Sequence, residues 1–338
     1  MTITAKELAQ KLHLSATAVS MALNDKPGVS TSTRQMVKRA AEEAGFDFSK
    51  LKHSEHDGVI YFISYRTHNA ILSYTPIFDK IFEGIKTELS TAGYTIRLVQ
   101  FNEKTDDLSD CFSDLRGAGC TGLILLGTEI SKEVCQKFLD LNIPMILLDT
   151  YYDSLDVTSV VINNSQGSYI ATDYLIGITG KQPGYLQCSY SIPNFTARQE
   201  GYFRAIKENG MSKSRSIIHT LSPSIEDAMA DMLDILDEGV PLAPCYFADN
   251  DILAIGAIKA FKLRGYRIPE DISIIGFDNI SEGRIIEPSL TTMDVPRFYI
   301  GQTAARLLID QLEMRLLHSQ KVEVSARLVK RLSHCKSI

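Results

Sequence analysis

The sequence lacks several features that would point to a secreted, membrane-bound or disulfide-stabilised protein. It contains no tryptophan, and no apolar run reaches the length of a membrane span. No signal peptide precedes the first predicted helix, so we expect a cytoplasmic protein without a membrane partner. The six cysteines form no CxxC pair and have no histidine at metal-ligand spacing. We therefore expect mostly buried free thiols and no metal site.

The short motifs of the common enzyme classes are also missing. There is no P-loop, no G-x-S-x-G nucleophile elbow and no metal-binding histidine helix. Residues 117–122 read G-x-G-x-x-G, but this pattern follows a predicted helix and opens a strand. A dinucleotide fingerprint has the opposite order, because it follows a strand and opens a helix. We expect a protein that is not an enzyme and that uses no cofactor.

Charge is distributed unevenly along the chain. The length of 338 residues suits two or three domains. Residues 1–52 carry eight Lys and Arg against five Asp and Glu, a net charge of +3. The whole chain has a net charge of −6, so the remainder carries −9. A basic N-terminal segment on an acidic remainder fits phosphate contact by that segment alone.

Residues 4–24 predict two short helices joined by a tight turn. Thr4 can cap the first helix, and Glu7 can close a capping box with it. Ser15 is a suitable cap for the second helix. The outer face of that second helix carries small residues, which would allow it to approach the DNA major groove closely. On this pattern alone, an ordinary helical hairpin is the alternative.

The next residues extend the pattern with a turn and a third helix. Residues 18–46, AVSMALNDKPGVSTSTRQMVKRAAEEAGF, resemble the headpiece of the lactose-repressor/galactose-repressor family. The frame is V-S-x-x-L-N, then V-S-x-x-T-R, then A-x-x-x-G-[YF]. The resemblance implies a homodimeric transcription regulator, a repressor, that binds double-stranded operator DNA. The residues expected to face DNA are Thr4, Ser15, Ala16, Thr17, Ala18, Ser20, Met21, Asn24, Ser30 and Thr33.

Two departures from the family pattern bear on DNA contact. Met21 stands where family members usually carry Arg, which removes one expected contact with a base or a phosphate. Residues 47–57 are polar and lack periodicity, so they read as a linker. The family usually has a hinge helix here, with a Leu that wedges into the minor groove. Leu51 is the one candidate for that wedge, and we expect weak insertion.

From Gly58 onward, short apolar runs alternate with helical segments, and the alternation occurs twice over about a hundred residues each. This predicts two similar lobes, each a doubly wound parallel sheet covered on both faces. Runs such as PMILLD, INNSQGSYIATDYL and FADNDILAIGAIKA resemble the same family, whose effector domain looks like the periplasmic sugar-binding proteins. Together, the pattern and the resemblance imply this division: a headpiece at 1–46, a linker at 47–57, an N-lobe at 58–162 with 292–320, and a C-lobe at 163–291 with 321–332.

Polar residues follow several predicted strands, where parallel sheets bind their ligands. Asp149, Asn250 and Asp278 follow strands, and Arg198 lies in the first turn of a predicted helix. A guanidinium with carboxylate and amide groups suits a neutral polyhydroxyl ligand, because each group fixes two hydroxyls. By resemblance, Arg198, Asn250 and Asp278 match effector-contacting positions, and Asp149 lies beside the hinge. Phe78 is a candidate for an apolar wall against a sugar ring.

Alternatives remain open at this stage. Helix capping or an interlobe salt bridge is the alternative role for Asp149. Val295 stands where many family members place Gln before Pro, which alters one polar contact. The effector is expected to be sugar-like, with a non-sugar ligand such as a nucleobase as the alternative. A sugar-transport binding protein or an enzyme on the same fold are the remaining alternatives for the whole chain.

Overall fold

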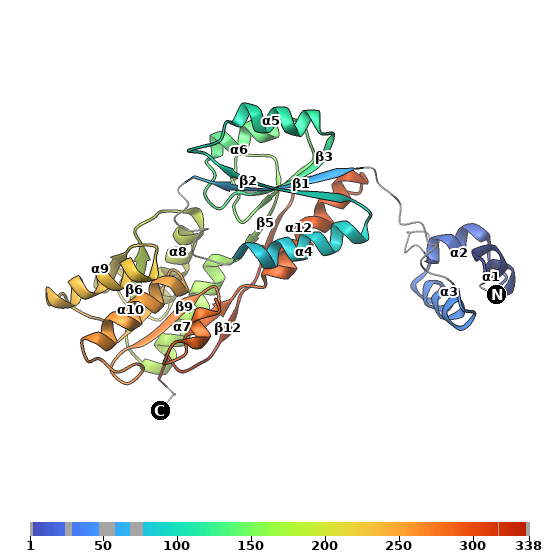
Figure 1. The fold of residues 1–338 in the computed structure, drawn as a ribbon. Coiled ribbons are helices and arrows are strands. Elements are labelled where there is room, and N and C mark those ends of the chain that lie inside the picture. Colours follow the sequence, from blue (N-terminus) through green and yellow to red (C-terminus); the bar gives the residue numbers. More distant parts are fainter. Residues whose placement is uncertain (1–2, 24–28, 47–57, 68–76, 317, 336–338) are drawn as a thin grey trace. The chain divides into compact units, whose positions relative to one another are not determined.

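The structure is a computed structural model that describes residues 3–23, 29–46, 58–67, 77–316 and 318–335. It contains two compact units, each described by itself below (Figure 1). The described residues before position 47 form a helical headpiece, and nearly all of the described residues from Gly58 onward form an α/β body. The expected DNA contact of Asn24 and the linker at 47–57, with Leu51, lie outside the described residues.

The headpiece folds as three helices, α1 (Ala5–Lys11), α2 (Ala16–Leu23) and α3 (Thr31–Glu43). The predicted capping box is present: Glu7 N donates to Thr4 Oγ1 at 3.3 Å, and Thr4 N donates to the Glu7 carboxylate at 2.8 Å. Ser15 caps α2 by accepting from Ala18 N at 3.1 Å. His13 makes the tight turn between α1 and α2 with a positive φ of 53°. The buried core comprises Leu8, Ala9, Val19, Ala22, Leu23, Val37 and Ala41.

The N-lobe of the body is built on a parallel sheet with the strand order β11-β5-β4-β3-β1-β2 within the described residues. Its strands are β1 (Val59–Arg66), β2 (Thr95–Asn102), β3 (Cys120–Leu126), β4 (Met145–Leu148), β5 (Thr158–Ile162) and β11 (Lys321–Val324). Its helices are α4 (Ile77–Thr91), α5 (Leu108–Gly117), α6 (Lys132–Leu139) and α12 (Arg297–Leu312). The strands β1, β3 and β4 are almost fully buried, as expected for a sheet covered on both faces.

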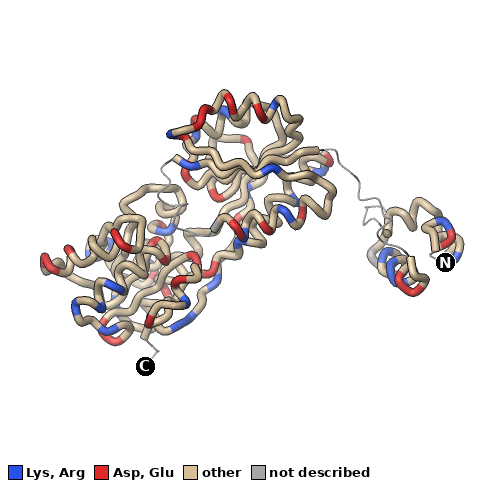
Figure 2. The backbone as a smooth tube through the Cα atoms, viewed as in Figure 1, with Lys and Arg blue, Asp and Glu red and all other residues tan. Residues whose placement is uncertain are grey.

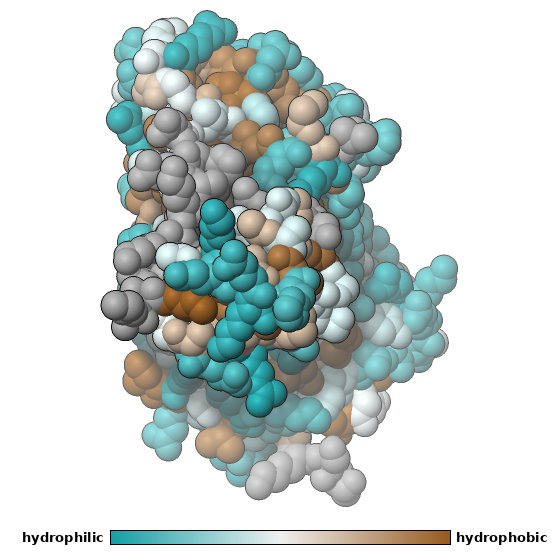
Figure 3. All heavy atoms as spheres, turned by 90° about the vertical axis from the view of Figure 1, so that its right-hand side faces the viewer, coloured by the Kyte–Doolittle hydropathy of each residue, from teal (hydrophilic) through white to brown (hydrophobic). Residues whose placement is uncertain are grey.

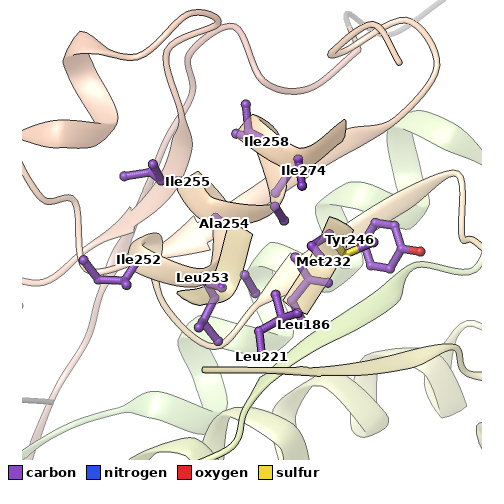
Figure 4. Close-up of a cluster of buried hydrophobic side chains, with 14 of the residues drawn as sticks. Leu186, Leu221, Met232, Tyr246, Ile252, Leu253, Ala254, Ile255, Ile258 and Ile274 are labelled. Atoms are coloured by element: carbon purple, nitrogen blue, oxygen red, sulfur yellow. The ribbon is translucent and has the colours of Figure 1, made fainter. Parts of the chain in front are cut away.

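The C-lobe repeats the plan with the strand order β12-β10-β9-β8-β6-β7. Its strands are β6 (Gly184–Cys188), β7 (Ile218–Leu221), β8 (Cys245–Ala248), β9 (Ser273–Phe277), β10 (Thr291–Asp294) and β12 (Arg327–Val329). Its helices are α7 (Asn164–Thr179), α8 (Pro193–Glu208), α9 (Ile225–Asp237), α10 (Asp251–Leu263) and α11 (Glu282–Ile285), with a 3-10 turn at Lys213–Arg215. Apolar residues of α10, such as Leu253, face Leu186, Leu221 and Met232 in the core shown in Figure 4.

The first crossing between the lobes, after β5, lies where it was expected, but the two later crossings differ by a few residues. The segment 292–320 was expected in the N-lobe; its helix α12 packs there, but β10 pairs with β9 of the C-lobe. The segment 321–332 was expected in the C-lobe as a single strand, but β11 pairs with β5 of the N-lobe. Only β12 joins the C-lobe, antiparallel to β10. A short apolar run shows that a strand forms but not which sheet edge it will join, because that choice depends on long-range pairing.

Helices α4 and α12 of the N-lobe approach each other closely at two glycines. A Cβ atom on Gly84 would lie 2.1 Å from the carbonyl oxygen of Phe298, and one on Gly301 would lie 2.1 Å from that of Ile81. Neither distance is compatible with a real side chain, so glycine is required at both positions for this spacing of the two backbones. Glu88 of α4 also accepts from Gln302 and pairs with Arg306 of α12. The two helices are therefore fixed to each other along their length.

Lys and Arg alternate with Asp and Glu along both the headpiece and the body (Figure 2). Hydrophilic residues cover most of the face shown in Figure 3, and hydrophobic residues form separate patches there. No disulfide joins the six cysteines, and burial raises the pKa of Cys135, Cys188 and Cys245 to about 11. Over the part of the chain that the structure describes, we find no helix long and apolar enough to cross a membrane.

Candidate functional site

Acidic and amide residues gather at the carboxyl ends of strands from both lobes, as expected for parallel sheets. Asp149 follows β4 of the N-lobe, and Asn250 and Asp278 follow β8 and β9 of the C-lobe. Asp149, Asp278 and Asn279 have positive φ angles of 69°, 108° and 51°. Such strained backbone costs about 1–3 kcal/mol for a residue with a side chain, and it concentrates at functional sites.

Arg198 of α8 is the centre of this cluster, and its side chain is only 4% exposed. Its Nε donates to Asn164 Oδ1 at 2.8 Å, and its Nη1 donates to the carbonyl oxygen of Asp249. Its Nη2 lies 3.4 Å from Asp278 Oδ1. The guanidinium is 3.7 Å above the Phe277 ring. Because α8 begins at Pro193, Arg198 lies in the second turn of the helix rather than in the first turn that the sequence suggested.

Asp149 connects the two lobes by hydrogen bonds. Its carboxylate accepts from Thr128 of the N-lobe at 2.6 Å and from Asn194 of the C-lobe at 3.1 Å. Asn194 Oδ1 in turn accepts from Asn164 Nδ2 at 3.2 Å. A continuous path of buried polar groups therefore runs from Asp149 through Asn194 and Asn164 to Arg198. Asp149 thus connects the lobes through a hydroxyl and an amide, and not through the interlobe salt bridge that the sequence left open as an alternative.

Three buried carboxyl groups around this path have raised pKa values. Burial raises the pKa of Asp149 to about 6, that of Asp249 to about 7 and that of Asp251 to about 8. Burial disfavours the charged form of an acid, and the nearby Asp278 adds to the effect. Neutral donors offset part of the shift, such as the Tyr185 hydroxyl on Asp249. The folded state therefore holds a proton on each of these three groups more tightly than an unfolded chain does.

Asn250 and Phe78 have local structural roles in this structure. Asn250 Oδ1 caps α10 by accepting from Leu253 N at 3.0 Å. Phe78 stacks on Phe62 with ring centroids 5.4 Å apart, and it lies 6.3 Å from Phe82. Sequence reasoning did not select Asn164, Asn194 or Thr128, because single asparagines and threonines near helix ends and turns are usually caps. Thr128 and Asn164 lie two residues after β3 and β5, which was the available signal, whereas Asn194 lies in the first turn of α8.

The volume of a cavity in the body does not indicate where the buried charged groups lie. One of about 230 Å³ opens between the lobes and is lined by Glu129 of the N-lobe and by residues 189–192 of the C-lobe. Its lining residues are close in sequence to Thr128 and Asn194. A larger one of about 830 Å³ is lined only by N-lobe residues of β1, β2 and α5 and the adjoining loops. We assign the candidate site to the interlobe cluster, because that is where buried charged groups converge.

The headpiece presents the residues expected to face DNA in two groups. Ala16, Thr17 and Ser20 are exposed on α2, and Ala18 and Met21 are half-buried. The other group takes part in helix starts. The members of that group are Thr4 and Ser15, described above, and Ser30 and Thr33 at the start of α3, where Ser30 accepts from Thr33 N at 3.1 Å. The outer face of α2 is therefore exposed over Ala16, Thr17 and Ser20.

A helix-turn-helix headpiece and a two-lobed α/β body with a charged cluster between its lobes define a ligand-responsive DNA-binding transcription regulator. A model of the periplasmic binding protein-like domain matches residues 188–334. The chain is 30% identical over 339 residues to the HTH-type transcriptional repressor PurR of Klebsiella pneumoniae, covering 98% of this chain and 96% of that protein. The chain belongs to the lactose-repressor/galactose-repressor (LacI) family of transcription regulators.

Ribose appears in the descriptions of two further similar proteins. The ribose operon repressor of Halalkalibacterium halodurans is 28% identical over 331 residues, which cover 97% of this chain and 96% of that protein. A crystal structure of a LacI family transcriptional regulator from Enterococcus faecium with bound ribose has a TM-score of 0.68. It is 27% identical and covers 82% of this chain and 98% of its own.

Proposed function

We propose that the protein is a homodimeric, cytoplasmic repressor of carbohydrate-related genes, controlled by a small sugar-like effector held between the lobes. The observation that carries this proposal is the path of buried polar groups from Asp149 to Arg198. It joins the lobes through hydrogen-bond donors and acceptors of the kind that sugar hydroxyls can replace. The names of the ribose operon repressor and of the ribose-bound regulator support a sugar.

The proposed control works through the separation of the lobes. A ligand that pairs with Arg198 and Asp278 on the C-lobe and with Asp149 on the N-lobe stabilises one arrangement of the lobes over another. It changes operator affinity only to the extent that it binds the two arrangements differently. The headpiece, proposed at 1–46, reads the operator with the outer face of α2, and residues 47–57 form its connection to the body.

The homodimer is proposed from the family to which the chain belongs. Two large apolar residues are exposed on different lobes of the body, Leu98 on the edge strand β2 (43%) and Ile285 of α11 (83%). Single exposed residues of this kind do not by themselves mark a protein–protein interface. A dimer also matches the two half-sites of a pseudo-palindromic operator, spaced about one helical turn apart.

A thermal-shift screen of the full-length chain against mono- and disaccharides tests the effector part of this proposal. We expect a small subset of sugars to raise the melting temperature, because a ligand that binds only the folded state stabilises it. The same sugars should then change the affinity of the chain for its operator. A sugar that stabilises the body without any effect on operator binding would contradict regulatory control.

A further inference from the structure

Arg297 has a buried hydrogen-bonding edge that the structure leaves open. It is the first residue of α12, directly after the crossover at 295–296, and its side chain is 12% exposed. Its Nε and Nη2 atoms are buried and have no hydrogen-bond partner among the described residues. The nearest acid is Asp278, whose Oδ1 lies 3.9 Å from Arg297 Nη2, too far for a hydrogen bond.

The open atoms of Arg297 have a defined recognition geometry. Nε and Nη2 lie on one edge of the planar guanidinium, and their two N–H groups are nearly parallel. That edge matches the two oxygens of a carboxylate, or two oxygens of a phosphate, in a bidentate pair. Buried donors of this kind are costly to leave unpaired, so the edge is suited to an acceptor that arrives with a ligand.

Arg297 and Arg198 share one nearby carboxylate, so one positive charge of the pair has no negative partner of its own. Asp278 Oδ1 lies 3.4 Å from Arg198 Nη2 as well as 3.9 Å from Arg297 Nη2. One carboxylate therefore faces two positively charged guanidinium groups. A single negative charge balances only one of them.

The other acids near this cluster are committed to other partners. Each accepts hydrogen bonds from neutral donors: Asp149 from Thr128 and Asn194, Asp249 from Tyr185 and Cys188, Asp251 from Thr292 and Ile280, and Asp294 from Asn279. Burial also raises the pKa values of Asp149, Asp249 and Asp251, which favours their neutral forms. Because their oxygens already accept these hydrogen bonds, none of these acids pairs with the open Nε and Nη2 edge of Arg297.

We propose that Arg297 is a specificity-determining residue of the effector site, and that the effector is a sugar derivative bearing an oxyanion, a carboxylate or a phosphate. The oxyanion pairs with the Nε and Nη2 edge of Arg297, and the hydroxyls are left to Arg198, Asp278 and Asp149. This inference rests on the proposed function of the interlobe cluster as the effector site. A neutral sugar offers hydroxyl acceptors to the same edge but no balancing charge.

Calorimetry on the full-length chain tests this assignment with three classes of probe. The first class is D-galacturonate and D-gluconate, the second is glucose 6-phosphate and ribose 5-phosphate, and the third is the neutral sugars D-galactose, D-glucose and D-ribose. We expect at least one anionic probe to bind about tenfold or more tightly than its neutral counterpart, because a buried charge pair adds to the hydroxyl contacts. The class that binds identifies the oxyanion as carboxylate or phosphate.

Variants at Arg297 separate charge pairing from general packing. Arg297→Gln should weaken the anionic probe about tenfold or more and change a neutral sugar by less than about threefold. Arg297→Lys keeps the charge but loses the fork, so it should fall between Gln and the parent. Arg267→Gln, at an exposed position paired with Asp271, is the matched control and should leave all affinities unchanged.

The outcomes distinguish this inference from the proposed function. The inference is overturned if neutral sugars bind more tightly than the anionic probes, or if Arg297→Gln loses the same affinity for both classes. The cluster then remains a sugar site. Failure of all the probes to bind overturns both proposals. If Arg297→Gln does not fold, as a melting curve would show, the comparison of Arg297→Lys with the parent decides by the same criterion.

Discussion

At the scale of single residues, the buried acids link stability to pH. Burial raises the pKa of Asp249 to about 7, above the value of about 3.9 for an unfolded Asp. The folded state therefore binds the proton more tightly. The stability that Asp249 contributes by binding this proton is complete below about pH 4 and is lost as the pH rises through about 7. Asp149, whose pKa rises to about 6, acts in the same direction over a lower range.

Asp249→Asn should remove part of this pH dependence. We expect the free energy of unfolding of the parent, relative to the variant, to increase by on the order of 1–2 kcal/mol between pH 8 and pH 6. The difference between the two proteins isolates Asp249. The comparison with the variant is needed because burial lowers the pKa of His219 and His334. Histidines with a lowered pKa make the folded state less stable as the pH falls. Urea unfolding at pH 6, 7 and 8 measures the difference, and parallel profiles for the two proteins would refute it.

Arg198 should matter to both folding and ligand binding. Arg198→Ala removes the partner of Asp278, Asn164 and the Asp249 carbonyl together, so it should lower the free energy of unfolding by about 3–5 kcal/mol. The affinity of this variant for any sugar that the parent binds should fall by about 2–4 kcal/mol. Calorimetry, with a melting curve on the same preparation, separates the two effects. Unchanged ligand affinity in a folded variant would remove Arg198 from the site.

The sequence could indicate the acids of the cluster but not the whole cluster. Asp149 and Asp278 were predictable because they end apolar runs, and parallel strands bring such ends together. Arg297 was not, because its place depends on where the chain crosses between lobes after β10. That crossing is decided by the pairing of β10 with β9, a long-range choice that leaves no local pattern. Asn164 and Asn194 were missed because asparagine has many local roles.

At the scale of elements, the crossing of α4 and α12 depends on its two glycines. Gly301→Ala places a methyl group against the Ile81 carbonyl, so it should destabilise the body by about 1–3 kcal/mol. Gly84→Ala should act similarly through Phe298. The matched control is Gly177→Ala in α7, where a Cβ meets nothing within 4 Å and the helix should gain up to about 1 kcal/mol. Thermal unfolding of the three variants should show opposite signs, and a neutral Gly301→Ala would contradict the packing.

The second helix of the headpiece should carry base recognition. Thr17 is exposed near the start of α2, and Thr17→Ala should cost about 1–3 kcal/mol in operator affinity if its side chain meets a base edge. Affinity for DNA of unrelated sequence should not change, because phosphate contacts supply that binding. Anisotropy titrations with both duplexes measure the ratio. An equal loss on both duplexes would assign Thr17 to general binding instead.

Element positions were largely predictable from the sequence, and sheet membership was not. The alternation of apolar runs with helical segments located most of the strands and helices of the body, because parallel sheets bury their strands on both faces. The last predicted strand was wrong as a unit, since β11 and β12 belong to different sheets. The helix α11 and the strand β10 were not predicted as elements, because they are short and their neighbours set their conformation.

At the scale of the whole molecule, a basic headpiece and an acidic body lie on one chain. The phosphate backbone of DNA then attracts the headpiece through a few positive charges, so operator affinity should fall steeply as the salt concentration rises. A sugar or sugar acid that binds the body should change the operator affinity without changing the slope of the salt dependence. This follows because the ligand alters the balance of two states rather than the phosphate contacts.

The most direct test of the central claim is selection of DNA by the full-length protein from a random duplex library, followed by anisotropy titration of the selected sequence. The account predicts enrichment of a pseudo-palindrome with half-sites about one helical turn apart. It also predicts an affinity for that sequence at least about a thousandfold above that for unrelated DNA at the same salt concentration. No enriched sequence, or equal affinity for selected and unrelated duplexes, would contradict the assignment of this chain as a sequence-specific regulator.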